Sequence, residues 1–469
     1  MAEPDVAGLD ATLASALPAE SVYAVGGRVR DEVRAALDGV ARPAKDLDYV
    51  AVGLTTEELV ARLARVGKAD VVGAAFAVVK CTIGAETVDV ALPRRERSTG
   101  TGHRDFIVEA GPDIPIEDDL ARRDFRMNML ARRLGDGRLV DPHGGEADIR
   151  ARRIDLLHAQ AFEEDPLRML RAAQFAARFD YAVTPATMEA MRKAAPLVAT
   201  VSAERVRDEL LKLLGAARPS IGFEVMRKGG ILRYVLPELA EGIGVEQNEY
   251  HRYDVYEHTL KTLDGAPPGD LIVRLGALFH DIAKPRTKDG PHFYRHESVG
   301  ATVAREVLER LRFSNEIVDR VGRLVQNHMY TADPARSPGS LRRFLRQVGI
   351  DNLSEQFALR AADIVGSGLP KRGDENERFE AEVRRVLDER PPLSVKDLAV
   401  DGADVIDAAV AAGALPQGSK GSPAVGAVLR TLLDRVIEEP ELNDREALLQ
   451  LLPSAIQAWK DERSTGNKR

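Results

Sequence analysis

The chain has 469 residues, with 66 Lys and Arg against 74 Asp and Glu, which gives a formal net charge of −8. This length exceeds what one hydrophobic core usually serves, so two to four domains are expected. The negative balance excludes wholesale electrostatic binding to nucleic acid and leaves room for local basic surfaces. The single cysteine, Cys81, excludes an internal disulfide framework and any site with several cysteine ligands.

The sequence contains no apolar run of about 18 residues, so no membrane helix is expected. The acidic N-terminal stretch lacks the basic start of a secretory signal. A cytoplasmic protein that does not contact a membrane is therefore the expectation.

The first informative stretch is a predicted strand, a Gly-Gly turn at Gly26 and Gly27, and a helix that carries Arg30, within residues 21–31. Glycine lets backbone N–H groups approach a phosphate closely, at the positive end of the following helix. Arg30 would project from the first turn of that helix. This pattern predicts a phosphate-binding turn.

Two aspartates, Asp46 and Asp48, stand at the start of the next strand, expected over residues 47–53. Side chains two apart on a strand point to the same face, so both carboxylates can share one small region. Such oxygen ligands suit Mg²⁺, and two metal ions about 4 Å apart can assist phosphate chemistry. Asp89, in the β-rich stretch 86–92, is either a third carboxylate of this site or an outward-facing strand residue.

The remaining head elements are a helix over residues 55–66 with Thr55 as N-cap, a long Gly/Ser/Thr/Pro loop over residues 94–117, and a helix over residues 118–130. Arg123 in that last helix suits a triphosphate, because guanidinium can bind phosphate with two parallel hydrogen bonds. Residues 138–155 are expected to close the domain with a strand and a turn.

From about residue 156 onward, helices dominate. Pro166 fits a first helical turn with Asp165 as N-cap, and Asp165 and Arg168 are three apart and share a face. A carboxylate and a guanidinium held together can recognise the Watson–Crick edge of a base. The alternative is an ordinary N-cap with a surface ion pair worth under about 1 kcal/mol. The helix predicted over residues 201–214 receives no chemical role.

A second group of residues lies between positions 250 and 370 and consists of imidazoles and carboxylates, which can bind a divalent metal and activate water. It comprises His258, His280, Asp281, His296, His328 and Asp363. Farther on, residues 371–395 predict a charged helix that ends at Pro-Pro, followed by more helices.

Six motifs between residues 21 and 240 together resemble the class II nucleotidyltransferases, the family of bacterial CCA-adding enzymes and poly(A) polymerases: VGGRVRD, DLDYV, VDVALPRRER, ARRDFRMN, EDPLRMLRAAQFAARF and ERVRDELLKLL. The resemblance implies an α/β head with a mixed sheet over residues 1–150 and an all-α neck over residues 151–245. The ordered His/Asp group resembles the HD metal-dependent phosphohydrolases, which implies an HD domain over residues 246–370. A C-terminal helical RNA-binding region would occupy residues 371–469.

Carried over by motif, the resemblance implies that Gly27 and Arg30 contact the triphosphate and that Asp46 and Asp48 bind Mg²⁺. Arg123 would contact the triphosphate or the base.

The resemblance also implies that Asp165 and Arg168 act as an amino-acid template and that Arg171 is a further nucleotide contact. The chain departs from the family's usual pattern at three positions, namely Gln174, Arg126 and Met129.

The implied reaction is template-independent addition of CCA to the 3′ end of tRNA from CTP and ATP, with no protein partner. The HD group would hold a second divalent metal and hydrolyse 2′,3′-cyclic or terminal phosphates. Addition of only CC or only A, or of poly(A), remains an alternative, although the intact 94–117 segment argues against CC alone. An HD phosphohydrolase with an RNA-binding head, or a non-catalytic RNA-binding module, is disfavoured by the complete Asp46 and Asp48 pair.

Overall fold

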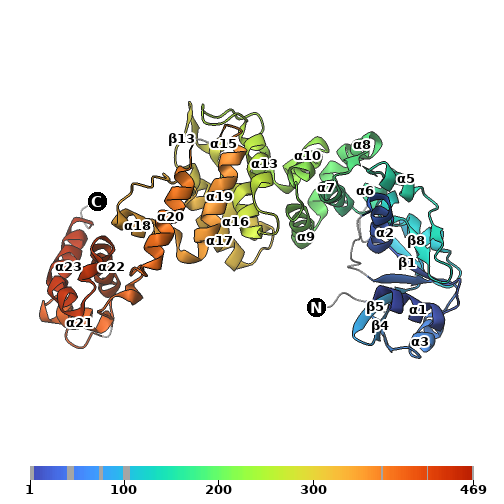
Figure 1. Ribbon diagram of the computed structural model, residues 1–469, viewed down its shortest axis with the longest axis horizontal. Coiled ribbons are helices and arrows are strands. Elements are labelled where there is room, and N and C mark those ends of the chain that lie inside the picture. Colours follow the sequence, from blue (N-terminus) through green and yellow to red (C-terminus); the bar gives the residue numbers. More distant parts are fainter. Residues whose placement is uncertain are drawn as a thin grey trace. The chain divides into compact units, whose positions relative to one another are not determined.

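The computed structural model describes residues 5–39, 47–72, 78–98, 106–370, 373–419 and 421–466 (Figure 1). The chain divides into two compact units, Met1–Ile243 with Arg310–Phe313 and Gly244–Glu309 with Ser314–Arg469. No helix in the described ranges is long and apolar enough to cross a membrane. The predicted division into four domains stays a prediction.

The first unit begins with a mixed sheet, as the resemblance implied. In the described residues it has seven strands in the order β3-β4-β5-β2-β1-β8-β9, and the one parallel pair is β2 with β5. The apolar residues of β1 are buried, because this strand lies inside the sheet. The strands are β1 Val22–Val25, β2 Asp48–Ala51, β3 Lys68–Val72, β4 Val78–Ile83, β5 Glu86–Ala91, β8 Ala131–Arg133 and β9 Leu139–Val140.

Short helices pack around this sheet, and the predicted cap of one of them is confirmed. Thr55 and Glu58 form a capping box that begins α3, since each side chain bonds to the other's backbone N–H. The head helices are α1 Val6–Ala16, α2 Gly27–Asp38, α3 Thr56–Leu63, α4 Ile116–Ala121, η1 Arg126–Asn128 and α5 Gly145–Arg150.

Two sequence predictions in the head differ from the structure. The predicted loop over residues 94–117 contains a hairpin, in which β6 Arg94–Ser98 pairs antiparallel with β7 Phe106–Ala110. Charged residues dominate β6, so its sequence lacks the apolar alternation that signals a strand. The predicted helix over residues 118–130 stops at Ala121, and the chain becomes extended at Phe125 before the short η1.

The rest of the first unit is helical. Helices α7, α9 and α10 pack against one another. A Cβ added at Gly222 in α10 would lie 2.8 Å from the Ala173 carbonyl oxygen of α7, so this close approach requires glycine. The elements are β10 Arg153–Ile154, α6 Ala161–Glu164, α7 Leu167–Phe179, β11 Ala182–Val183, α8 Pro185–Ala194, η2 Ala195–Thr200, α9 Ala203–Leu214, α10 Ser220–Lys228, α11 Leu232–Val235 and α12 Pro237–Ala240.

The second unit is mainly helical and contains separate apolar clusters around Phe379 and around Leu432. The charged helix predicted before the Pro-Pro pair is present as α20. Its elements are α13 Val255–Gly265, α14 Leu271–Phe279, α15 Lys284–Thr287, β12 Lys288–Asp289, β13 His292–Phe293, α16 His296–Arg310, α17 Asn315–Gln326, α18 Pro338–Val348, η3 Ile350–Asn352, α19 Leu353–Gly366, α20 Glu375–Asp388, η4 Val395–Asp397, α21 Gly402–Ala411, α22 Pro423–Glu438, η5 Pro440–Leu442 and α23 Arg445–Gly466.

Candidate nucleotide cavity and metal centre

A cavity of about 470 Å³ lies in the first unit between the start of α2, the segment after α4, and α7 with α9. Most of its lining side chains are charged or polar, and arginine is the commonest. It is lined by Gly26, Gly27, Arg28, Arg30, Asp31, Asp48, Arg123, Asp124, Asn128, Asp165, Leu167, Arg168, Arg171, Gln174, Phe175, Arg178, Arg205 and Lys212. The structure thus brings together most of the head residues that the sequence singled out, and its excess of guanidinium groups suits a polyanion.

The two glycines of the turn differ in what they require. Gly26 has φ 76° and ψ −139°, a conformation that side-chain-bearing residues rarely adopt, and a Cβ there would lie 3.1 Å from Arg123 Nη1. Gly27 begins α2 with an ordinary backbone, and a Cβ there would meet nothing nearer than Arg30 Nη2 at 3.4 Å. Gly26 therefore shapes the turn, whereas Gly27 leaves space beside the helix N-terminus.

Arg30 is fixed in one orientation at the cavity wall. Its Nη1 donates to Asn128 Oδ1 at 2.8 Å and its Nη2 donates to Asp31 Oδ2 at 2.8 Å. The guanidinium also lies 4.6 Å from the centre of the Phe179 ring, a cation–π distance. Since the side chain is only 5 % exposed, Arg30 is a preorganised cation.

Asp124, in the ARRDFRMN motif, connects α2 to α7. Its Oδ2 accepts from Arg171 Nε at 2.7 Å, and its Oδ1 accepts from Asn128 Nδ2 at 2.8 Å. Burial would raise the pKa of the Asp124 carboxyl, but the Arg171 charge and the hydrogen bonds outweigh it and lower that pKa. An ionised Asp124 thus holds Arg171 and, through Asn128, Arg30.

A second buried carboxylate, Asp119, orients Arg123. Asp119 Oδ2 accepts from Arg123 Nη2 at 3.0 Å, and its Oδ1 accepts from Arg122 Nη2 at 2.8 Å. Burial would raise the pKa of Asp119, but the two arginines outweigh it and lower that pKa. Arg123 therefore reaches the cavity on a fixed support.

Asp165 and Arg168 both line the cavity but are not paired with each other. Asp165 Oδ2 accepts from Arg205 Nη2 at 3.1 Å, whereas Arg168 donates to Glu164 Oε2 at 3.3 Å and to the Arg122 carbonyl at 2.8 Å. The two groups share the cavity wall without a hydrogen bond between their side chains, and their role in base recognition stays a prediction. Each group is instead oriented by its own partner.

The helix start beside this pair also differs slightly from the prediction. The N-cap of α7 is Pro166, while the Asp165 carboxylate accepts from Leu167 N at 3.2 Å. The Asp165 side chain therefore still satisfies one free N–H group of the helix start.

Sequence reasoning missed three cavity arginines, namely Arg28, Arg178 and Arg205. Arg205 lies in the ERVRDELLKLL motif, whose helix received no chemical role. Arg178 Nη1 lies 2.8 Å from the Gln174 side-chain amide, which accepts from it when the amide is oriented with its oxygen toward Arg178. No carboxylate among the described residues lies within ion-pair distance of Arg178. The spacing of four between Gln174 and Arg178 on one helix was the available signal.

The other two departures from the family pattern lie outside the cavity lining. Arg126 forms ion pairs with Asp155 and, at 3.5 Å, with Asp148. Met129 is buried in an apolar cluster of the head.

The carboxylates of the predicted magnesium site are described only in part. Asp46 lies outside the described residues. Asp48 lines the cavity, and it stands opposite Asp89 in the parallel pairing of β2 with β5. The Asp89 carboxylate forms an ion pair with Lys80 at 3.2 Å. The paired strands place two oxygen donors side by side, which fits a hard divalent cation, and the roles of all three aspartates stay predictions.

The second predicted group is brought together in the second unit, from five different segments. His258 comes from α13, His280 and Asp281 from the end of α14, His296 from the start of α16, His328 from the segment after α17, and Asp363 from α19. Asp281 stands between two pairs of imidazoles. Its Oδ2 is 3.2 Å from Nε2 of both His258 and His280, and its Oδ1 is 3.5 Å from His296 Nε2 and 3.6 Å from His328 Nε2.

Backbone contacts orient three of these rings. The Nδ1 atoms of His280, His296 and His328 lie 2.9, 2.8 and 2.7 Å from the carbonyl oxygens of Ala277, Phe293 and Val325. A carbonyl can only accept, so Nδ1 carries the proton and Nε2 keeps its lone pair in the neutral ring. The lone pairs face the cluster centre, which is the arrangement of imidazole metal ligands.

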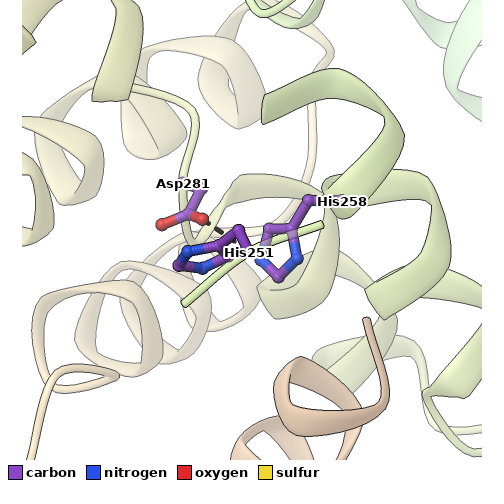
Figure 2. A group of neighbouring side chains, drawn as sticks. All are labelled: His251, His258 and Asp281. Carbon is purple, nitrogen blue, oxygen red and sulfur yellow. Dashed lines mark ion pairs between the residues drawn. The ribbon is translucent and has the colours of Figure 1, made fainter. Parts of the chain in front are cut away.

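His251 was missed by sequence reasoning, although it stands only seven residues before His258. Figure 2 shows His251 with His258 and Asp281, and the ligand atoms of these three lie within 4.8 Å of one another. Burial, with the nearby Lys284 charge, lowers the pKa of His251 to about 3. Burial also lowers the pKa of His258, but Asp281 and Asp363 outweigh it and raise that pKa to about 9.

The donor atoms fall into further triads that suit metal ions. His258, His280 and Asp363 form one, and Asp281, His296 and His328 form another. Mixed nitrogen and oxygen donors of this kind fit a divalent transition metal. A cavity of about 870 Å³ is lined by five members of the cluster, namely His280, Asp281, His296, His328 and Asp363.

Three family models match successive parts of the chain. The model described as "Poly A polymerase head domain" matches residues 22–155. "Probable RNA and SrmB- binding site of polymerase A" matches residues 180–243, and "HD domain" matches residues 249–409. The first two regions contain part of the cavity lining, and the third contains the whole His/Asp cluster. The class is therefore a nucleotidyltransferase head joined to an HD domain.

Curated relatives cover most of the chain. The Multifunctional CCA protein of Nitrosococcus oceani is 39% identical over 367 residues, which are 75% of this chain and 86% of that protein. The one of Verminephrobacter eiseniae is 36% identical over 424 residues, 87% of this chain and 96% of that protein. The chain belongs to the family of multifunctional CCA proteins, which confirms the predicted resemblance.

Solved structures share the fold over nearly the whole chain. The CCA-adding enzyme of Bacillus stearothermophilus in complex with CTP has a TM-score of 0.68 at 23% identity and covers 98% of both chains. The CCA-adding enzyme of Thermotoga maritima complexed with tRNA has a TM-score of 0.57 at 20% identity and covers 97% of this chain and 96% of that one. Both likenesses support the predicted succession of a mixed-sheet head and helical regions.

Proposed function

We propose that the cavity of the first unit adds C, C and A to the 3′ end of tRNA, using CTP and ATP and no nucleic-acid template. One observation carries this proposal: a single cavity joins a phosphate-binding turn to oriented donors and acceptors suited to a base. The relatives' name and the CTP and tRNA bound by similar structures support it. The site would act in the cytoplasm.

The reaction is a phosphoryl transfer that needs alignment and charge neutralisation. The 3′ oxygen of the RNA forms a bond to the α-phosphorus, the bond from that phosphorus to the pyrophosphate oxygen breaks, and the hydroxyl proton passes to water. Asp46 and Asp48 would hold Mg²⁺, which would supply positive charge at the reacting phosphate, and Asp89 in register with Asp48 would add a third carboxylate. Arg30 would bind the triphosphate beside the Gly26 and Gly27 turn.

Base selection would rest on Asp165 and Arg168. The Asp165 carboxylate accepts from the exocyclic amino group that cytosine and adenine share, and the Arg168 guanidinium donates to a ring acceptor. Arg205 holds Asp165 from one side, and the Arg122 carbonyl holds Arg168. UTP and GTP present an oxygen where CTP and ATP present that amino group, so they leave Asp165 without a donor.

Incorporation by single nucleotides tests this proposal. The protein is incubated with tRNA that ends at the discriminator base, Mg²⁺ and labelled CTP or ATP. We expect two additions with CTP alone and a third once ATP is present. An enzyme that stops at CC, adds only A, or extends an A tail would select one of the alternatives, and no incorporation at all would refute the proposal.

A second function is favoured by the His/Asp cluster. We expect it to hold one or two divalent metal ions and to hydrolyse 2′,3′-cyclic or terminal phosphates of RNA. For a cyclic ester, a water oxygen bonds to phosphorus, one ring P–O bond breaks, and a proton passes to the oxygen that leaves. Bound metal ions would lower the pKa of water, while Asp281, placed between the two imidazole pairs, would serve both triads.

Metal analysis and hydrolysis assays test the second function. We expect the full chain to retain a divalent metal and to open cytidine 2′,3′-cyclic phosphate, and we expect His280→Ala to lose both. Hydrolysis without any bound metal, or full activity in the variant, would contradict the assignment.

A further inference from the structure

A second cavity of about 760 Å³ adjoins the His/Asp cluster within the second unit. Its volume is in the range of a small-molecule or nucleotide pocket. Met329, Arg360 and Asn376 line both this cavity and the one that contains the cluster, so they form a shared wall. We define the second cavity as the side pocket.

Arg360 ties the side pocket to the cluster. Its guanidinium pairs with Asp363 at 3.4 Å and lies 5.6 Å from the centre of the Tyr330 ring, which lines the side pocket. In the described part of the chain, Arg360 Nε and Asn376 Oδ1 are buried and have no hydrogen-bond partner. A buried donor and a buried acceptor without partners cost stability. A ligand that offers both an acceptor and a donor would satisfy the two atoms on this wall.

The charge of the side pocket favours an anion. Arg336, Arg343 and Arg360 line it, and Glu375 is the one acidic residue among its lining residues. Arg343 is neutralised by Glu438. The Arg336 guanidinium lies 5.7 Å from the Phe379 ring centre, and no carboxylate among the described residues lies within ion-pair distance of it. A half-buried cation without a counter-charge is available to a phosphate.

We propose that the side pocket binds the nucleotide that precedes the phosphate group presented to the His/Asp cluster. The substrate of that cluster is then an RNA 3′ end of at least two nucleotides rather than a free mononucleotide. The base lies against Tyr330 and the internucleotide phosphate meets Arg336, because aromatic rings and cations together bind single-stranded RNA. This inference rests on the proposed phosphohydrolase function.

Hydrolysis by the full chain of two substrates tests the proposal. These are cytidylyl-cytidine 2′,3′-cyclic phosphate and cytidine 2′,3′-cyclic phosphate. We expect about tenfold higher kcat/KM for the dinucleotide, and we expect Arg336→Gln to remove this preference without changing the mononucleotide rate. Arg346→Gln is the matched control, because Arg346 lies on the nearby α18, pairs with Asp434 and does not line the side pocket. Equal kcat/KM for both substrates in the unaltered protein, or an equal loss on both in Arg336→Gln, overturns the proposal.

Photo-crosslinking separates this inference from the function on which it rests. The probe is a dinucleotide 3′-monophosphate with 4-thiouridine as its first base, and the cross-linked peptides are mapped by mass spectrometry. A cross-link within residues 329–347 that Arg336→Gln loses supports the side pocket, even if neither cyclic phosphate is hydrolysed and the phosphohydrolase proposal fails. Hydrolysis without a cross-link in this segment overturns the side pocket and leaves the phosphohydrolase standing.

Discussion

At the residue scale, the turn between β1 and α2 contains two glycines with different roles. Gly26 is needed for the fold, and Gly27 is expected to serve ligand binding. Gly26→Ala should lower the free energy of unfolding by about 1 to 3 kcal/mol, because its φ of 76° strains any side-chain-bearing residue. Gly27→Ala should cost under about 1 kcal/mol, yet reduce CTP binding about tenfold or more by filling the space beside the helix N-terminus. Hydrogen exchange in α2 and calorimetric CTP binding measure the two effects. Equal stability losses, or unchanged CTP affinity in Gly27→Ala, would contradict this division.

Arg178 is a cavity cation that lies beside the Gln174 amide and the Phe179 ring and forms no ion pair with a described carboxylate. Arg178→Gln should raise the KM for both CTP and ATP about tenfold with little change in their ratio, because it removes a charge-assisted hydrogen bond to the triphosphate. Arg178→Lys should restore part of the loss. Arg150→Gln is the control, since Arg150 is exposed on α5 and pairs with Glu146. A change in base preference instead of KM would assign Arg178 to base recognition.

Local motifs identified most of the cavity residues, because each lies in a short pattern with its own chemistry. The residues that contact and orient them could not be predicted in the same way. Arg205 is 40 positions from Asp165, and only the packing of α9 against α7 brings the two together. His251 lies outside any helix, so no helical pattern in the sequence indicated a role for it. Only the fold brings it beside His258 and Asp281, where it can act as a metal ligand.

At the scale of elements, two buried carboxylates connect the phosphate end of the cavity to the base end. They are Asp119 in α4 and Asp124 in the segment that follows it. Both Asp119 and Asp124 have pKa values below the usual 3.8. Carboxyls with lowered pKa values stabilise the fold fully above the unfolded pKa, and this contribution is lost as pH falls through the folded pKa. The region should therefore hold its stability from about pH 7 to about pH 5 and lose it below about pH 4.

Asp124→Asn tests this dependence. At neutral pH it should destabilise the region by about 2 kcal/mol, because Arg171 loses its charged partner. Below about pH 4, the stability of the region should fall less steeply with pH in the variant than in the unaltered protein. Hydrogen exchange in residues 116–130, corrected for intrinsic rates, measures both. An unchanged acid profile in the variant would show that Asp124 is not a titrating support.

The sequence pattern predicted the strands around residues 22–25, 48–51 and 86–91 of the head, but it missed β6, β7 and β8. In β6, charge replaces the apolar alternation that signals a strand. Strand β6 is made of RRERS and is identified only through its pairing with β7. Helix α4 ends at Ala121, although Arg122 and Arg123 still pair with Asp119 at the helical spacings of three and four, so this periodicity alone did not predict where the helix stops.

At the scale of the whole molecule, the chain carries two chemically different sites in two compact units. Asp48→Asn should abolish nucleotide addition and leave phosphate hydrolysis intact, whereas Asp281→Asn should do the reverse. Parallel assays on one preparation of each variant measure this. Loss of both activities together in either variant would contradict two separable sites.

Metal removal should distinguish the same two sites. After chelation both activities should fall, because each relies on divalent metal. Added Mg²⁺ should restore nucleotide addition at the oxygen-ligand site, while hydrolysis at the imidazole-rich cluster should respond best to a transition metal. The same metal preference in both assays would contradict the claim that the two sites bind metal through different ligand atoms.

The central claim is that Asp165 and Arg168 choose the incoming base without a nucleic-acid template. The most direct test of this claim is to incubate the protein with tRNA that lacks CCA and equal concentrations of all four nucleoside triphosphates. The sequence added to the tRNA is then determined. We expect mass spectrometry to find CCA and no longer product in the unaltered protein. We expect Arg168→Ala to incorporate UMP or GMP from UTP or GTP while it keeps its tRNA binding. Uniform loss of all incorporation in that variant, with no change in base choice, would contradict it.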